Sequence, residues 1–353
     1  MLKDNNIGFL RLLFAYFVIL SHSPQMIDGN AYREIIFMIT KTVDLGELAL
    51  QGFFLISGYL ICQSYENSRS FFSWLIKRIL RIYPAFIVVW CVCVFVVAPL
   101  AGGWQILSEI SNPEWFRMVI KVFALSVPHV NDLFLTTNVD TLNGSLWTIR
   151  YEFLCYLIIP LIAFINLSKK NVLLALLVTV IFNFSTKLFG VDPGFDFPFP
   201  FSSHTFSWFA IAFIAGMCFY KFRESIIWNH KISITCLILL ITCLQFSTVA
   251  ALGFSIFGGY LLFNFAFNFK NAFTQKVGQK YDISYGVYIY AWPIQTLIIQ
   301  SNPAINPWVL SITTIVLVSI LGLVSWVIIE KPFMRLKKYL DRPSDTHIKL
   351  SPT

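Results

Sequence analysis

Ionisable side chains within apolar stretches are the residues of this sequence best placed to do chemistry. Arg11 and His22 interrupt the first apolar stretch, and Arg150 and Glu152 interrupt a later one. If these stretches cross a membrane, a charged group at the centre costs at least about 2.5–3.5 kcal/mol on insertion scales. Residues retained at that cost are candidates for function.

Arg11 and His22 are eleven residues apart. On a helix this separation is about 20° past three full turns, so both side chains project from nearly the same face, about 16 Å apart along the axis. That face offers a fixed cation near one end and a titratable imidazole near the other. Alternatively, Arg11 extends to the membrane interface and His22 merely caps a helix.

Glu152 lies about 7–8 Å deeper than Trp147, which we expect to anchor the same helix at the membrane interface. A buried carboxylate needs a partner or a proton, and the candidate partners are His22, Arg11 and Arg150. A histidine beside a buried carboxylate is a general-base arrangement, because the carboxylate fixes the imidazole tautomer and stabilises imidazolium. A structural ion pair is the alternative.

A basic run precedes another apolar stretch. Lys77, Arg78 and Arg81 lie just before Tyr83, and Lys77 and Arg81 share a helix face because they are four residues apart. Such a cluster suits the phosphates of a cytosolic ligand. Ordinary anchoring of a membrane helix by basic residues is the alternative explanation.

Hydroxyl groups are frequent in two other stretches. Ser57 adjoins Gly58 among small residues that favour close helix packing. The sequence places no base next to Ser57 that could activate it as a nucleophile. Tyr285 and Tyr288 are three residues apart and share one helix face. The sequence has no phosphate-binding loop, dinucleotide-binding, metalloprotease or esterase motif. The seven cysteines form no CxxC pair, so we expect no metal site.

The composition defines the class of protein that holds these residues. Of the 353 residues, 57% are hydrophobic and only 12% are charged, whereas soluble domains average roughly 25% charged residues. Such a chain cannot cover a water-facing surface. This excludes a cytosolic globular enzyme, a disordered chain and a soluble nucleic-acid binder. The sequence therefore predicts an all-α, polytopic transmembrane helical bundle.

About ten stretches are apolar enough to cross a membrane as helices. They are 7–23, 45–63, 82–100, 146–165, 171–186, 205–220, 232–248, 250–267, 283–300 and 309–329. The stretch 115–127 is short and basic, so we predict a helix that lies on the membrane surface. The Pro- and Asp-rich segment 187–204 is predicted to be a loop. Residues 1–335 form one membrane domain, and 336–353 a short cytoplasmic tail.

Basic residues predict the orientation of these helices. With the N-terminus inside, 19 of the 26 Lys and Arg residues fall on inside segments, five fall outside and two lie within spans. Positive residues concentrate on cytoplasmic segments, so both termini are predicted to be cytoplasmic. The net charge of +8 then needs no polyanionic partner. A cleaved signal peptide at the first stretch is the alternative.

Taken in order, these pieces resemble the acyltransferase-3 family of integral membrane acyltransferases. The shared pattern is the Arg11–His22 spacing and the segments 53–60 (FFLISGYL), 77–84 (KRILRIYP), 145–156 (SLWTIRYE…Y) and 284–293 (SYGVYIYAWP). It covers about residues 7 to 335. Each motif alone is weak, but five in the correct order are specific.

The resemblance implies transfer of an acyl group, usually acetyl, from cytoplasmic acyl-coenzyme A to a hydroxyl of an extracytoplasmic or lipid-linked saccharide. Polysaccharide modification in the cell envelope, a bacterial inner membrane and no metal follow from it. His22 matches the essential histidine and Arg11 its paired arginine. Glu152 matches the fourth-span glutamate, and Arg78 and Arg81 match a basic pair that engages coenzyme A.

Two departures from the family pattern stand out. Many relatives have histidine where this chain has Ala291, and Arg150 replaces a residue that is commonly small or apolar. The change at Arg150 bears on the acceptor pocket.

The resemblance suggests a hypothesis for catalysis. Lys77, Arg78, Arg81 and Tyr83 hold the acyl-coenzyme A, and His22 deprotonates the acceptor hydroxyl. The remaining candidates are predicted to bind substrate or stabilise the oxyanion: Ser145, Trp147, Arg150, Tyr285 and Tyr288. The rival class is a transporter or flippase of lipid-linked saccharides, although no paired broken helices or internal symmetry are evident.

Overall fold

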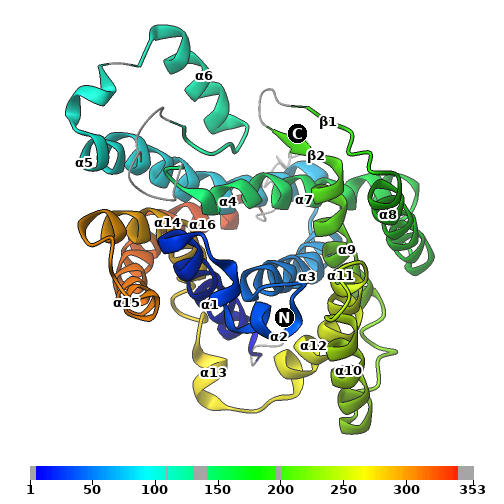
Figure 1. Ribbon diagram of the computed structural model, residues 1–353. Coiled ribbons are helices and arrows are strands. Elements are labelled where there is room, and N and C mark those ends of the chain that lie inside the picture. The colour runs from blue at the N-terminus through cyan, green and yellow to red at the C-terminus, as the bar shows by residue number, and fades with distance from the viewer. Residues whose placement is uncertain (1–4, 109, 130–140, 196–199, 341–353) are drawn as a thin grey trace, which may run out of the picture.

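Helices make up nearly all of the computed structural model, which describes residues 5–108, 110–129, 141–195 and 200–340 (Figure 1). The α-helices are α1 (Ile7–Asp28), α2 (Ile35–Thr40), α3 (Leu45–Glu66), α4 (Phe71–Val92), α5 (Ala98–Gly102), α6 (Asn112–Phe123), α7 (Trp147–Ile165), α8 (Lys169–Phe189), α9 (Ser203–Lys221), α10 (His230–Cys243), α11 (Ala250–Gly253), α12 (Gly259–Asn268), α13 (Ala272–Lys276), α14 (Ser284–Ser301), α15 (Pro307–Ser325) and α16 (Lys331–Leu340).

Shorter elements connect these helices. Three π-helical turns join α4 to α5, α11 to α12 and α15 to α16, namely η2 (Cys93–Val97), η5 (Phe254–Gly258) and η6 (Trp326–Glu330). Three 3₁₀ turns are η1 (Ala31–Arg33), η3 (Trp104–Leu107) and η4 (Gly144–Leu146). Strands β1 (Gly194–Phe195) and β2 (Phe201–Ser202) pair antiparallel, with Gly194 opposite Ser202.

Within the described residues, eight helices are long and apolar enough to cross a membrane. The 22 residues of α1 or α3 extend about 33 Å, which matches a hydrocarbon core of about 30 Å. Each of the ten stretches expected from the sequence contains a helix, although the helix in 232–248 ends at Cys243, and the predicted all-α class is confirmed. The two that fall outside the eight are α10, with only 14 residues, and the hydroxyl-rich α14. The number of spans and their sidedness stay predictions.

Two segments differ in detail from the sequence prediction. The stretch 115–127 contains the amphipathic helix α6, of which Met118 is the buried residue. The predicted loop 187–204 is shorter than expected, because α8 continues to Phe189 and α9 begins at Ser203. The β1–β2 hairpin lies between them.

Helix α3 lies in the middle of the bundle, between α1 and α9, and α14 packs between α1 and α15 (Figure 1). The backbones of α3 and α9 approach closely. A Cβ atom added to Gly58 would lie 1.8 Å from the carbonyl oxygen of Phe213, and one added to Gly216 would lie 2.0 Å from that of Leu55. The close packing predicted for the small residues of this segment is therefore confirmed at Gly58.

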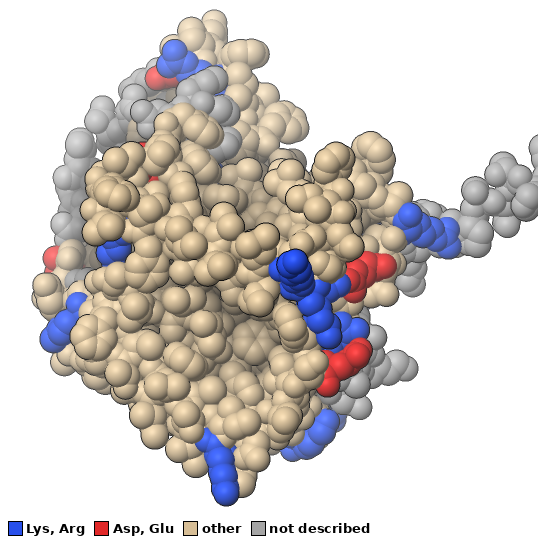
Figure 2. Space-filling model, turned by 90° about the vertical axis from the view of Figure 1, so that its right-hand side faces the viewer, with Lys and Arg blue, Asp and Glu red and all other residues tan. Residues whose placement is uncertain are grey.

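Helices α8 and α10 form the periphery and expose apolar side chains. Leu173, Leu177 and Ile181 of α8 and Leu237 and Ile238 of α10 are all exposed. Figure 2 shows this face of the molecule as mostly uncharged, with Lys, Arg, Asp and Glu gathered mainly toward its edges. A surface of this kind is stable against lipid and costly in water.

Candidate active site

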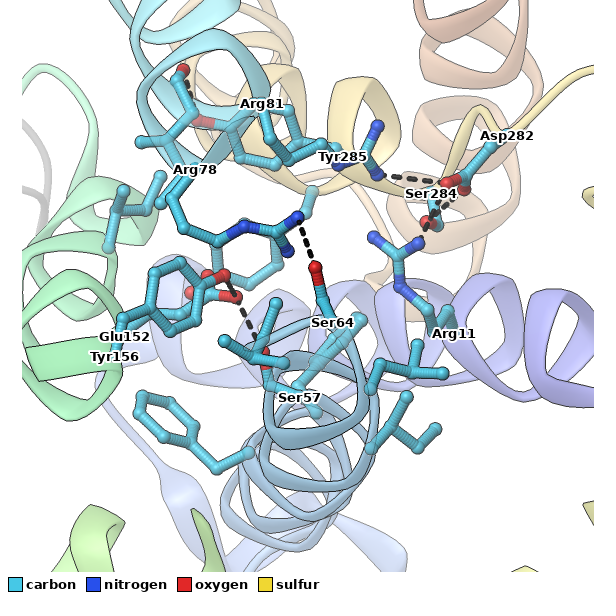
Figure 3. Close-up of a pocket in the computed structure, with 18 of the residues that line it drawn as sticks. Arg11, Ser57, Ser64, Arg78, Arg81, Glu152, Tyr156, Asp282, Ser284 and Tyr285 are labelled. Atoms are coloured by element: carbon cyan, nitrogen blue, oxygen red, sulfur yellow. Dashed lines mark hydrogen bonds and ion pairs between the residues drawn. The ribbon is translucent and has the colours of Figure 1, made fainter. Parts of the chain in front are cut away.

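A cavity of about 540 Å³ lies among α1, α3, α4, α7, α14 and α16, and we call it the main cavity (Figure 3). Its volume falls within the roughly 300–1,000 Å³ typical of sites for small molecules. Among the described residues, four cationic side chains and two carboxylates line it: Arg11, Arg78, Arg81, Lys337, Glu152 and Asp282. This described lining therefore carries an excess of positive charge.

Two of the four cations are neutralised by an ion-pair network at one wall. Arg11 donates to Asp282 at 2.7 Å, and Arg81 donates to the same carboxylate at 2.9 Å. Arg81 also lies 3.3 Å from Glu330, which the π-helical turn η6 brings to this wall. Burial favours the neutral form of Asp282, yet the charges of Arg11 and Arg81 hold its pKa well below the usual range of a carboxyl.

Arg78 and Lys337 carry the excess charge. Arg78 donates to the Ser64 hydroxyl at 3.2 Å, and its Nε has no hydrogen-bond partner among the described residues. Lys337 reaches the cavity from α16, close enough to Arg78, Arg81 and Lys77 to be repelled by their charges. A bound anion would relieve this repulsion.

Glu152 lies on the opposite wall and is held by two hydroxyl groups. Ser57 of α3 donates to its Oε1 at 3.0 Å, and Tyr156, one turn further along α7, donates at 2.5 Å. Figure 3 shows Glu152 and Tyr156 beside the side chain of Arg78, away from Arg11 and Asp282. Glu152 is close enough to Arg78 for their opposite charges to attract.

Two tyrosines of α14 line the same cavity. The hydroxyl of Tyr288 lies 2.7 Å from that of Thr148, and the hydroxyl of Tyr285 donates to the carbonyl of Ile82 at 3.0 Å. The proton of Tyr285 is thus engaged by the backbone. The Tyr288–Thr148 pair is the better placed of the two to reorganise around a substrate.

His22 lies outside the residues that line the main cavity. Its half-buried ring packs edge-on against Trp292, with 5.1 Å between the ring centroids. The side chain of Gln25 lies near the ring, and the carboxylate of Asp44 is close enough to act on it electrostatically. Asp44 caps α3 and also accepts a hydrogen bond from Ser21 at 3.1 Å.

The main cavity unites six of the residues singled out in the sequence: Arg11, Arg78, Arg81, Glu152, Tyr285 and Tyr288. It does not unite them all. The hydrogen bonds of Glu152 go to Ser57 and Tyr156, so in the described residues it and His22 have separate partners.

The remaining candidates lie elsewhere. Lys77 is buried, with its ammonium group 3.5 Å from the Ser68 hydroxyl, and Tyr83 donates to the carbonyl of Phe123. Ser145 is buried, and its hydroxyl has no partner among the described residues. Trp147 and Arg150 line a second cavity.

Sequence reasoning missed Asp282, Lys337 and Asp44. Asp282 lies in a connection, and nothing in its spacing relates it to Arg11 or Arg81. Lys337 was assigned to a tail beginning at 336, but α16 continues through it. A signal was present there, because Met334 and Lys337 are three residues apart and share the face that lines the cavity.

Comparisons with known proteins point to one kind of enzyme. Residues 4–331 match a family model described as an acyltransferase domain. An "O-acetyl transferase" of Shigella phage Sf6 is 29% identical over 345 residues, which are 94% of this chain and 96% of that protein. "Nodulation protein 10" of Rhizobium leguminosarum bv. viciae is 24% identical over 365 residues, 95% of each chain. No solved structure matches significantly.

Proposed function

The chain belongs to the acyltransferase-3 family of membrane acyltransferases, and from that premise we propose that it is an O-acetyltransferase. The donor is acetyl-coenzyme A or another acyl-coenzyme A, and the acceptor is a hydroxyl of an extracytoplasmic or lipid-linked saccharide. The observation that carries this proposal is the family match over nearly the whole chain together with a cavity that holds excess positive charge. The name of the phage relative supports acetyl as the group transferred.

The cationic end of the main cavity suits the phosphates of the donor. Arg78 and Lys337 have no carboxylate in ion-pair contact among the described residues, whereas Arg81 is shared between Asp282 and Glu330. A phosphate can therefore bind Arg78 and Lys337 without displacing a carboxylate from either, and it gains the charge-assisted hydrogen bonds that guanidinium and ammonium groups donate. In this proposal Arg81 positions the wall and Arg78 contacts the donor.

The acetyl end of the donor would extend along the cavity toward Thr148 and Tyr288. Tyr288 and Trp292 are four residues apart on α14, so they share a face and are separated by one helical turn, about 6 Å. His22 packs against Trp292. The imidazole of His22 therefore lies about one turn of α14 from Tyr288 at the cavity. This supports a reaction between the donor's acetyl group and an acceptor bound by His22.

His22 acts as the general base in this mechanism. It takes the proton of the acceptor hydroxyl while the oxygen attacks the carbonyl carbon of the thioester. The carbon–sulfur bond then breaks, and the coenzyme A thiolate takes the proton from imidazolium. The Asp44 carboxylate stabilises imidazolium electrostatically, which is the role that the sequence hypothesis gave to Glu152. Glu152, held by Ser57 and Tyr156, positions the polar wall of the cavity.

The product distinguishes this function from the rival one. Native membrane vesicles that contain the chain, supplied with isotope-labelled acetyl-coenzyme A, should yield an acceptor heavier by one acetyl group. A transporter or flippase would move its cargo without a change in mass. A comparison of lipid and glycan masses in cells with and without the protein would identify the acceptor.

Location in a bacterial inner membrane with both termini cytoplasmic is part of the same proposal. The charge distribution of the sequence supports it. A reporter domain that is active only in the cytoplasm should therefore be active when it is fused to either terminus.

A further inference from the structure

We propose that a polar cavity between the starts of α3 and α9 binds an uncharged sugar unit of the acceptor. We call it the α3–α9 cavity. Its volume is about 220 Å³, and the end of α8 and the connection between α10 and α11 complete its walls. This volume lies below the roughly 300–1,000 Å³ of sites for larger ligands, so the cavity suits a single small ring. The inference rests on the proposed function, because it names the part of the acceptor that the chain holds.

Hydrogen-bond acceptors line the α3–α9 cavity without partners of their own. Asn183 of α8 is only 8% exposed, and its amide nitrogen donates to the Ser207 hydroxyl at 2.8 Å. Its amide oxygen has no hydrogen-bond partner among the described residues. The Glu47 carboxylate accepts one hydrogen bond there, from the backbone of Asp44 at 3.2 Å, through one of its two oxygens. A polar oxygen withdrawn from water is costly without a partner, so these oxygens favour a ligand that donates hydrogen bonds.

Donors face the same space from other elements. Lys187, near the end of α8, donates to the carbonyl of Ser247 at 3.3 Å, and an ammonium group has three protons to donate. His204, at the start of α9, has its Nδ1 2.9 Å from the Thr186 hydroxyl, and its Nε2 has no partner among the described residues. Thr248 adds an exposed hydroxyl from the connection between α10 and α11. The cavity therefore offers donors as well as acceptors.

This mixture of groups favours a sugar over an ion. Among the described residues that line the cavity, Glu47 is the acidic one and Lys187 the basic one, so neither sign of charge dominates. The described lining of the main cavity is different, because cations outnumber carboxylates there. Hydroxyl groups both donate and accept hydrogen bonds, as the groups of the α3–α9 cavity require. The ring of Trp208 adds apolar surface for the C–H groups of a sugar.

The cap of α3 connects this cavity to His22. Glu47, which lines the cavity, and Asp44 form the capping box that begins the helix. The Asp44 carboxylate accepts a hydrogen bond from Ser21 of α1 and is close enough to His22 to act on it electrostatically. The cavity wall and the carboxylate beside the proposed base are thus three residues apart on one helix. One sugar unit can occupy the cavity while a neighbouring unit presents its hydroxyl to the imidazole.

The position of the cavity in the bundle agrees with an acceptor that arrives from outside. The predicted orientation places the ends of α1 and α8 and the starts of α3 and α9 on the extracytoplasmic side. Arg78 and Lys337 of the main cavity belong to segments predicted to lie toward the cytoplasm. Donor and acceptor would therefore enter from opposite sides of the membrane.

Two kinds of substitution test the cavity through acetyl transfer. The full chain in phosphatidylcholine nanodiscs receives isotope-labelled acetyl-coenzyme A and increasing amounts of the saccharide fraction extracted from membranes of the cells that contain the protein. K187M with T248V removes two donors from the lining, and A251F fills the space with a ring. Each should raise the KM for the saccharide fraction about tenfold or more. The KM for acetyl-coenzyme A should stay unchanged.

A matched control separates this effect from a general change in the chain. K121M with T235V also removes a lysine and a threonine, but both lie outside the lining of the α3–α9 cavity. It should leave both Michaelis constants unchanged. An unchanged KM for the saccharide fraction in either cavity variant would overturn the proposed site. A fall in kcat alone would also overturn it, because it would show an effect on the base without one on acceptor binding.

Chemical protection tests binding without acetyl transfer. Thr248 is exposed in the cavity, so T248C should react with a water-soluble maleimide, and mass spectrometry measures the label at that residue. The saccharide fraction should slow this labelling several-fold. It should not do so when A251F is added, nor at S301C, an exposed position outside the cavity lining.

The outcomes of the protection experiment are distinct. Absence of protection would overturn the proposed site, and equal protection by phospholipids of the same membranes, freed of saccharide, would overturn the assignment to a sugar. Protection that persists while the unsubstituted chain forms no acetylated product would support the site and count against the proposed function.

Discussion

Replacing Arg78 and Arg81 one at a time should give two different defects, although the sequence presents them as one basic pair. Arg78 faces the main cavity with only the Ser64 hydroxyl as a hydrogen-bond partner among the described residues. Arg81 is shared by Asp282 and Glu330. R78Q should therefore weaken binding of coenzyme A in a folded protein, whereas R81Q should destabilise the fold.

The magnitudes follow from these contacts. A hydrogen bond to a charged group contributes about 1.5–3 kcal/mol, and each 1.4 kcal/mol changes a dissociation constant tenfold. R78Q should raise the Kd for coenzyme A about 10- to 100-fold. Removing one partner from a buried ion pair costs about 3–5 kcal/mol, and the Glu330 side chain is only 1% exposed. R81Q should therefore lose about that much unfolding free energy.

The assay combines calorimetric binding of coenzyme A with denaturant unfolding, both on the full chain in nanodiscs. R69Q is a matched control, because it removes one arginine from the connection between α3 and α4, outside the cavity lining. An R78Q protein that binds coenzyme A as tightly as the unsubstituted chain would contradict the assignment. So would an R81Q protein of unchanged stability.

Three further predictions concern other contacts. D282N should cost about 3 kcal/mol of unfolding free energy, because it leaves two arginines without their shared carboxylate. In the unsubstituted chain, the ion pairs of Asp282 should persist as pH falls below about 3.9, the unfolded pKa, and break only at the lower pKa of the folded carboxyl. An acid midpoint near about 3.9 would argue against these ion pairs. G58V should lower the melting temperature more than A49V on the same helix, because its side chain would meet the carbonyl oxygen of Phe213; equal melting temperatures would contradict the close approach. K337Q should raise the Kd for coenzyme A by a smaller factor than R78Q, since a lysine binds phosphate as a point charge without a fork of donors; calorimetry checks the order, and no change would place Lys337 outside the donor site.

The positions of the helices were predictable because they depend on local composition. Each of the ten apolar stretches contains a helix, since a segment that cannot hydrogen-bond to water must satisfy its own backbone. Helix α3 begins at the predicted residue, after Asp44, whose side chain accepts a hydrogen bond from its first turn. Helix α9 begins two residues earlier than predicted, because the Ser202 side chain caps it there.

The partners of the charged residues were less predictable, because they depend on contacts between distant segments. The cost of a charge within an apolar stretch singled out Arg11 and Glu152, and both line the main cavity. Local sequence does not give their partners. It could not place Asp282 beside Arg11, which is 271 residues away in the sequence. The same limit applies to His22, for which Asp44 lies on a different helix and only the folded chain brings the two together.

The role of His22 is the central claim, and one product measurement tests it most directly. Native membrane vesicles with the unsubstituted chain, H22A or the exposed-histidine control H230A receive isotope-labelled acetyl-coenzyme A, and mass spectrometry counts acetylated acceptor per folded protein. The account predicts product with the unsubstituted chain and with H230A, and none above background with H22A at equal folded amounts. Undiminished acetylation by H22A would contradict it.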